Sequence, residues 1–320
     1  MPTYPTDPDG LIYRRAVIAA RLTDDDLRRS VRAGEITSVM RGVFVVAGDR
    51  KATEWHRLKA IAYARCRESA AAAENPEGDE PPKRVPLSHQ SAAVILGIEM
   101  LRPSLRRVHT TAGPVGGFRT DTQHNHAAHL SDDDIIEVQG VLVTSMERTA
   151  VDVACTATNF AAALAVFDSA LRQGADRGVM RGMLVGRRRG IAQARRALHH
   201  ADAGAENPGE SWSRAQMIEA GFPIARLQRE FLDEDGNLVA RTDFDWEGKL
   251  VGEFDGKVKY KKLLRPGEDP AEVVVREKAR EDALRAMGVM VVRWIWKDLE
   301  QGLMVPRVRS WLVSLKLMPA

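Results

Sequence analysis

The sequence predicts a mixed α/β protein, α+β overall, with three domains. Segments with helical hydrophobic period alternate along the chain with short segments of strand-like alternation. Residues 70–86 and 201–209 are rich in proline or small polar residues and lack hydrophobic period, which is typical of linkers. We therefore expect domains over residues 1–70, 86–200 and 205–320 of this 320-residue chain.

The first domain is predicted to be a winged helix-turn-helix. Residues 11–21 have helical spacing, and Thr23 with Asp26 forms a capping signal for a second helix that would end at Gly34. The next residues, ITSVMRGVFVVAG, alternate like the two strands of a hairpin. Two helices followed by a hairpin with a basic tip are typical of a winged helix that binds DNA.

Arginines on the second helix and at the hairpin tip are the candidates for DNA contact. Leu27 and Val31 mark the buried face of that helix, so its arginines are expected on the outer face, near the major groove and phosphates. The candidates are Arg28, Arg29, Arg32 and Arg41. A solvated charged face on a small interaction domain is the alternative.

The middle domain is predicted to be α/β, with the strand candidates RRVHTTAG and VQGVLVTS leading into helices. His124, His126 and His129 could ligate a metal, but no carboxylate or cysteine completes the set at a suitable spacing, which favours a surface histidine cluster. An arginine-rich helical region follows. Its candidates for phosphate contact are Arg187, Arg188 and Arg189, with a solvated helix face as the alternative.

The last domain is predicted to have the element order αβββαβ. A helix begins at Glu210 and ends at Gly221, and a strand near residues 227–231 precedes the hairpin of residues 241–260. A capped helix then runs from Asp269 towards Gly288 and leads into a final strand, VMVVRWIW.

The hairpin RTDFDWEGKLVGEFDGKVKY gathers carboxylates and a lysine. A two-residue turn would place Asp243 and Glu253 on opposite faces, whereas a three-residue loop pairs Trp246 with Leu250 and brings the two acids opposite each other. We prefer the three-residue loop because one face of the hairpin is then apolar and the other is polar. The apolar face holds Phe244, Trp246, Leu250 and Phe254, and the polar face holds Asp243, Asp245, Glu253, Asp255 and Lys257.

The element order and the lines EFDGKVKY and REKAREDALRAMGVMVVRWIW resemble the PD-(D/E)xK nuclease superfamily, in its very-short-patch-repair-related branch. The resemblance covers roughly residues 210–299 and implies a restriction-endonuclease-like fold with a catalytic site. It implies that Asp243 is the strand-two aspartate, Glu253 the strand-three acid and Glu210 the helix-one glutamate. Lysine usually stands two residues after the strand-three acid, where this chain has Asp255. Either Lys257 serves from a shifted position or the lysine role is lost.

Such a site would use Mg²⁺, because this hard cation prefers oxygen ligands. Asp243, Glu253 and Asp255 are its expected ligands, and without a cation their charges repel. Lys257 would orient water or stabilise charge on the phosphate, and Gln228 could help to position the water. A solvated strand face is the alternative, as is an acidic surface that binds a basic partner protein.

Upstream, GEITSVMRGVFVV, LSHQSAAVILGI and VTSMERTAVDVA resemble the antitoxins of abortive-infection type IV toxin-antitoxin systems. This resemblance implies a winged-helix DNA-binding repressor with a second domain, and a cognate toxin protein as its partner. The alternative to a nuclease is therefore an antitoxin-type repressor whose nuclease-like domain does not cut. DNA is the expected partner under both resemblances.

Composition fits a folded cytoplasmic protein. No apolar run approaches the roughly 20 residues that span a bilayer, and the N-terminus does not read as a signal peptide. The two cysteines are too few for a zinc site or a disulfide framework. Because the net charge is only +3, nucleic-acid contact is predicted from local clusters of arginine.

Overall fold

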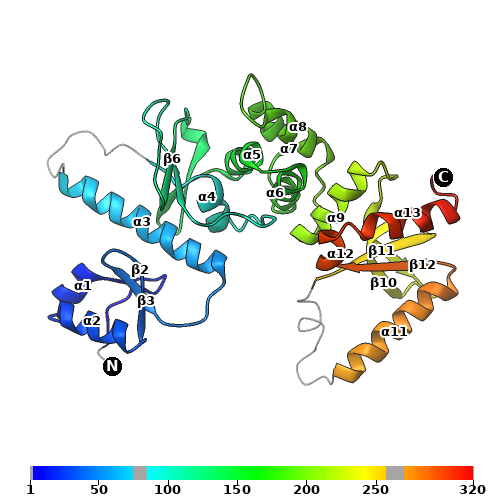
Figure 1. The fold of residues 1–320 in the computed structure, drawn as a ribbon, viewed down its shortest axis with the longest axis horizontal. Helices are drawn as coiled ribbons and strands as arrows, with labels where there is room; N and C mark the ends of the chain where they lie inside the picture. The colour runs from blue at the N-terminus through cyan, green and yellow to red at the C-terminus, as the bar shows by residue number, and fades with distance from the viewer. Residues whose placement is uncertain (1–2, 75–84, 257–269, 320) are drawn as a thin grey trace. The chain divides into compact units, whose positions relative to one another are not determined.

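The computed structural model describes residues 3–74, 85–256 and 270–319, without the side chains of residues 71–74 and 270–277. It divides into two compact units, one of residues 1–98 and 103–153 and the other of residues 99–102 and 154–320. Both units mix helices with open sheets, so the predicted α/β class is confirmed (Figure 1). The division into three domains stays a prediction. No helix in the described part of the chain is long and apolar enough to cross a membrane.

The first unit contains three small sheets and four helices of its own among the described residues. In chain order its elements are β1 (Leu11–Tyr13), α1 (Arg14–Ala19), α2 (Asp24–Arg32), β2 (Ile36–Met40), β3 (Val43–Val46), α3 (Ala52–Glu74), α4 (His89–Leu96), β4 (Val108–Thr111), β5 (Phe118–Arg119), β6 (Gln123–His126), β7 (Ile135–Val138) and β8 (Val141–Thr144). The sheets have the strand orders β1-β3-β2, β4-β6-β5 and β7-β8.

The N-terminal helices and hairpin form largely as the sequence predicts. Thr23 and Asp26 make a reciprocal capping box at the start of α2, and Gly34 follows its end with a positive φ of 70°. Two details were wrong. Residues 11–13 are a strand paired with β3, and Val31 is 40% exposed, because Ser30 turns inward and accepts a hydrogen bond from Tyr4.

One hydrophobic core joins the hairpin to the second and third sheets of this unit. Val43 and Val45 of β3 pack in the same cluster as Ile61 of α3 and Val143 of β8. Leu87 bridges the sheets, since its backbone pairs with both β4 and β8. The strands of the middle region are therefore fixed against α3 and α4.

The second unit consists of a helical layer followed by a four-stranded sheet, and α5 (Met146–Thr156) leads into it from the first unit. Its other described elements are α6 (Phe160–Arg172), α7 (Arg177–Met183), α8 (Ile191–His200), α9 (Pro208–Glu219), β9 (Arg226–Leu232), β10 (Leu238–Trp246), β11 (Leu250–Asp255), α11 (Pro270–Ala286), β12 (Met290–Ile295), α12 (Trp296–Glu300) and α13 (Met304–Ser314). The sheet has the order β12-β11-β10-β9, with β12 parallel to β11 and the other pairs antiparallel.

Helices cover both faces of this sheet (Figure 1). The core of one face combines Phe244 and Trp294 with side chains of α9, α12 and α13, and Leu284 of α11 packs on the other face against Val251. Backbones approach closely on the first face. A Cβ on Gly209 would lie 2.1 Å from the ring of Phe254, and a Cβ on Gly252 would lie 2.4 Å from the ring of Trp294.

The segment of residues 201–209, expected as a linker, is packed within the second unit. Ala201 and Ala205 are buried, and Asp202 donates its backbone N–H to Asp168 at 2.7 Å. Asn207 caps α9, which begins at Pro208, two residues before the predicted start at Glu210. This packing fixes the N-terminus of α9, where Glu210 lies.

Candidate active site

The β10–β11 hairpin has the predicted register. Trp246 pairs with Leu250 and Phe244 pairs with Gly252, so a three-residue loop connects the strands. Glu247 and Gly248 have positive φ values of 55° and 70°, and Lys249 closes the loop by donating its N–H to the Trp246 carbonyl at 3.0 Å. The loop length therefore decides that the acids lie on one face.

The two faces of the hairpin separate as expected. Phe244, Trp246, Leu250 and Phe254 all belong to the core shared with α9, α12 and α13. On the opposite face the acids are largely buried. Asp243 is 8% exposed, Asp245 is 3% exposed and Glu253 is 4% exposed. Buried carboxylates need compensating partners, and each of these acids has a different set.

Asp243 lies across from Glu253 in this register and is tied to the neighbouring strand. Its Oδ2 accepts the backbone N–H of Phe254 at 2.8 Å. This bond fixes the carboxylate beside β11, next to the position of Glu253.

Asp245 has a structural role. Its Oδ2 accepts from Arg229 at 2.8 Å and its Oδ1 accepts the Gly248 N–H at 2.9 Å. Both oxygens therefore hold the hairpin loop and strand β9. Asp255, at the end of β11, is half-buried, and Lys257 lies outside the described residues, so its role stays a prediction.

Glu253 is held by two arginines from other elements. Arg293 of β12 donates from Nε to Oε2 at 2.8 Å, and Arg280 of α11 donates to the same oxygen at 3.0 Å. Arg293 also pairs with Glu281. Burial opposes the charge on Arg293, yet the hydrogen bond and charge of Glu253 raise the pKa of this guanidinium. Among the described residues, Oε1 of Glu253 is buried without a hydrogen bond, although Arg280 lies 2.9 Å away.

Glu210 and Gln228 meet near the same hairpin. Gln228 Nε2 donates to Glu210 Oε2 at 3.4 Å, and Glu210 also accepts the Glu206 N–H at 2.7 Å. The β9–β10 register pairs residues 227 and 229 with residues 244 and 242, which places Gln228 beside Asp243. Gln228 has a positive φ of 51°, an unusual backbone for a residue within a strand. The structure thus connects four of the predicted residues, Glu210, Gln228, Asp243 and Glu253.

The hairpin acids match Mg²⁺ in donor chemistry. All are oxygen donors, although Oε1 of Glu253, which accepts no hydrogen bond among the described residues, forms an ion pair with Arg280 at 2.9 Å. They are not gathered tightly, however. The group of three potential ligands that the described residues bring within 4.8 Å of one another is a histidine group, not these acids. A cation must therefore compete with Arg280 and Arg293 for Glu253.

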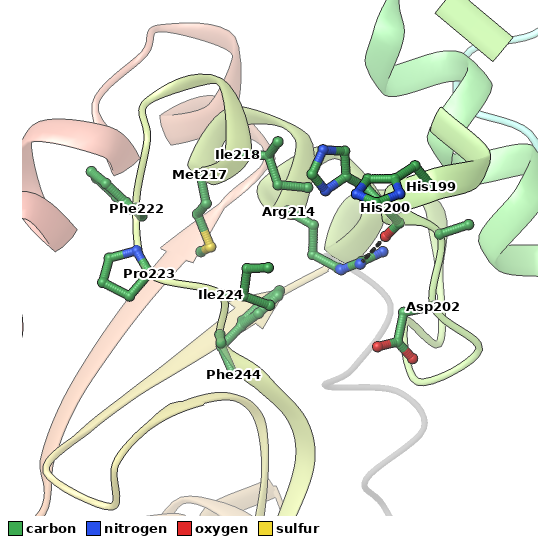
Figure 2. Close-up of a pocket in the computed structure, with 12 residues that line it drawn as sticks. His199, His200, Asp202, Arg214, Met217, Ile218, Phe222, Pro223, Ile224 and Phe244 are labelled. Carbon is green, nitrogen blue, oxygen red and sulfur yellow. Dashed lines mark hydrogen bonds between the residues drawn. The ribbon is translucent and has the colours of Figure 1, made fainter. Parts of the chain in front are cut away.

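A pocket of about 230 Å³ lies beside Phe244, on the apolar side of β10 (Figure 2). Phe244 contributes to its wall, and Figure 2 shows Arg214 between His200 and Ile224. Arg214 donates to the His200 carbonyl at 2.5 Å and to Asp168 at 2.7 Å. Burial raises the pKa of Asp168, and the charge of Arg214 opposes that shift. Arg214 therefore compensates a buried acid, and this pocket is distinct from the hairpin site.

The predicted nucleic-acid contacts fall into two groups. Arg28, Arg29, Arg32 and Arg41 are all exposed, the first three on α2 and the last at the β2–β3 turn. Arg28 pairs with Asp25 at 2.6 Å and Arg29 pairs with Asp26, so part of their charge is compensated within the helix.

Arg187, Arg188 and Arg189 are also exposed, but they were wrongly expected in a helix. They lie in the loop between α7 and α8, where Gly186 and Gly190 have positive φ values and interrupt helical structure.

The prediction of the histidine cluster was wrong for one of its three residues. His129 is exposed outside the group, and His109 of β4 takes its place beside His124 and His126. Spacing along the chain could not reveal this, because His109 reaches the cluster through the pairing of β4 with β6.

No family model matches the chain. Two curated proteins of Mycobacterium tuberculosis, the uncharacterized proteins MT2308 and Rv2248, are each 30% identical to it over 226 residues. The matched residues make up 63% of this chain and 79% of each mycobacterial chain.

Proposed function

The chain belongs to the same family as the two mycobacterial proteins, and from its own site we propose that it is a cytoplasmic DNA-binding protein with a magnesium-dependent endonuclease domain. The proposed reaction is hydrolysis of DNA phosphodiester bonds at the β10–β11 hairpin. The observation that carries it is the placement of Asp243 across from Glu253, both buried, with Gln228 and Glu210 beside them.

Each acid has a proposed role. Asp243, Glu253 and Asp255 would hold Mg²⁺, which when bound neutralises charge on the scissile phosphate and activates water. Asp243 is already oriented by the Phe254 N–H. Glu210 orients Gln228, which lies next to Asp243 and can position water. Lys257 would assist at the phosphate, and the exposed arginines would hold the DNA backbone.

The test is cleavage of supercoiled and linear DNA by the full chain with Mg²⁺ or with chelator. We expect nicking that needs Mg²⁺ and falls by at least about 100-fold in Asp243→Asn and Glu253→Gln, because each change removes a ligand charge. Asp282→Asn is the matched control, since this acid is exposed on α11 and pairs only with Arg285 among the described residues. Circular dichroism verifies that each variant is folded. Cleavage that survives in both hairpin variants would refute the site.

A second function is favoured by the two arginines on Glu253. Because Arg280 and Arg293 already compensate this acid, Glu253 does not need a cation to balance its charge. In this alternative the protein is an antitoxin-type transcriptional repressor with a cognate toxin as partner, and its nuclease-like domain does not cut. Specific binding to an operator, with no cleavage at any Mg²⁺ concentration and no Mg²⁺ binding by calorimetry, would decide for the repressor.

A further inference from the structure

Three histidines line one face of the small sheet in the first unit. Strands β4 and β6 are parallel, with His109 paired with His124 and Thr111 paired with His126. Successive strand side chains alternate, so His109, His124 and His126 share a face, while Thr110 and Asn125 share the other face and bond at 2.9 Å. The histidine face is therefore set by the register of the sheet.

The three imidazoles are close enough to share one ion. A ring nitrogen from each lies within 4.8 Å of the others, and Nδ1 of His109 lies 2.9 Å from Nε2 of His126. Zinc bonds to histidine of about 2.0 to 2.1 Å in a tetrahedral arrangement set nitrogen atoms roughly 3.4 Å apart. Side-chain adjustments of about 1 Å would thus convert the cluster into a three-histidine ligand set.

The rings are held in place by their surroundings. His126 lies between His89 and His124, with ring centroids 3.5 Å and 3.7 Å away. The backbone N–H of His109 donates to Ser91 at 2.8 Å, which anchors β4 to α4. Little side-chain freedom remains to be lost when an ion binds.

Thr111 adds a polar atom to the histidine face. Its Oγ1 is fully buried without a hydrogen bond among the described residues, and Thr111 pairs with His126 in the register of the sheet. This face of the sheet therefore has a buried oxygen next to the three imidazoles.

We propose that His109, His124 and His126 form a binding site for a divalent transition metal of the zinc type. Imidazole ligands suit zinc, cobalt and nickel, whereas Mg²⁺ prefers oxygen. Three histidines leave a further position for water, as in open zinc sites. The site differs in chemistry and in compact unit from the hairpin acids, so it does not depend on the proposed nuclease activity.

The test is metal binding by the full chain, purified without a histidine tag and stripped with chelator. Titration with Zn²⁺ is followed by calorimetry, and titration with Co²⁺ by visible absorption, which reports tetrahedral coordination. We expect one ion per chain at this site and at least about tenfold weaker binding in His124→Gln. His124 is half-exposed, so its replacement should leave the fold intact.

His129→Gln is the matched control, because His129 is exposed three residues beyond His126 and outside the cluster. The double variant Asp243→Asn, Glu253→Gln should keep full zinc affinity. Zinc binding unchanged in His124→Gln and in His109→Gln, or no binding by the folded wild-type chain, would overturn the proposal.

Discussion

At the proposed magnesium site, Arg280 and Arg293 would compete with the cation for Glu253. Both guanidinium groups contact Oε2 of this acid, and a divalent ion must overcome their attraction. Only Arg280 lies on a helix outside the sheet, so its removal leaves the pairing of β11 with β12 intact.

Arg280→Gln should therefore strengthen Mg²⁺ binding, by roughly 1 kcal/mol or about fivefold in Kd, since one competing charge is lost. Calorimetric titration measures this. Arg285→Gln is the control, because Arg285 pairs with Glu281 and Asp282 rather than with Glu253. A weaker affinity in Arg280→Gln would show that Arg280 helps to organise the site instead of competing for it.

Gly252 is a position at which adding a single methyl group should clearly lower the stability of the protein. Its Cβ would lie 2.4 Å from the buried ring of Trp294, which donates to Ser213 at 2.8 Å and is fixed in place. Gly252→Ala should lower the free energy of unfolding by about 1 to 3 kcal/mol. Gly256→Ala provides the comparison in urea denaturation, because its Cβ would meet Phe254 at an ordinary 3.5 Å.

At the scale of elements, α2 depends on its N-terminal cap. Thr23 accepts the Asp26 N–H at 3.2 Å and Asp26 accepts the Thr23 N–H at 2.8 Å. Thr23→Ala should cost about 1 kcal/mol of stability. Thermal unfolding of Thr37→Ala, an exposed threonine on β2, serves as reference; an equal loss in both variants would count against a specific capping effect.

The contact of α3 with α4 and β4 predicts a pH dependence. His56 lies in a chain in which its Nδ1 donates to the Leu105 carbonyl at 3.0 Å and its Nε2 accepts from Ser91 at 2.9 Å, the tautomer that satisfies both partners. Burial lowers the pKa of His56 below its ordinary value. The folded state then binds fewer protons than the unfolded state once the pH falls below about 6.5.

The contribution of neutral His56 to the free energy of unfolding should be fully present above about pH 6.5. It should decline as the pH falls towards the lowered pKa of His56 in the folded state. Urea midpoints between pH 7.5 and 5.5 measure the decline, and His56→Gln should flatten it. An unchanged slope in the variant would assign the effect to other groups.

Elements fixed by contacts between residues close in sequence could be predicted, whereas those fixed by contacts between residues far apart in sequence could not. The register of β10 and β11 followed from local alternation, because Phe244, Trp246, Leu250 and Phe254 all had to face one core. The arginines on Glu253 could not be predicted, because Arg280 and Arg293 come from elements more than 25 residues away in sequence. The membership of the histidine group was wrongly predicted for the same reason, because the parallel pairing of β4 with β6 brings His109 beside His124.

At the scale of the whole molecule, the net charge is only +3, so the proposed DNA binding would depend on local patches of arginine. The two groups of arginines lie in different local structures. Arg28 and Arg29 lie on α2, and each pairs with an aspartate one turn away. Residues 187–189 lie in a loop between Gly186 and Gly190 and are exposed.

Replacing Arg187, Arg188 and Arg189 by glutamine should reduce the salt dependence of DNA affinity by about two to three units of the logarithmic slope, if all three touch phosphate. The double replacement of Arg28 and Arg29 should change the slope less, because adjacent carboxylates already offset their charge. Fluorescence anisotropy from low to high salt measures both. An identical slope in wild type and triple variant would exclude the loop from the DNA interface.

The pairing of Glu253 with Arg293 has a consequence for the order in which the second unit forms. The hairpin that carries Glu253 leaves the ribosome well before β12, the strand that brings Arg293. Until that strand arrives, burying the acid would leave a charge without one of its main counterions. The hairpin should therefore stay open to water during synthesis and close only when residue 293 has emerged from the ribosome. Nascent chains stalled before and after that point should differ sharply in their resistance to protease.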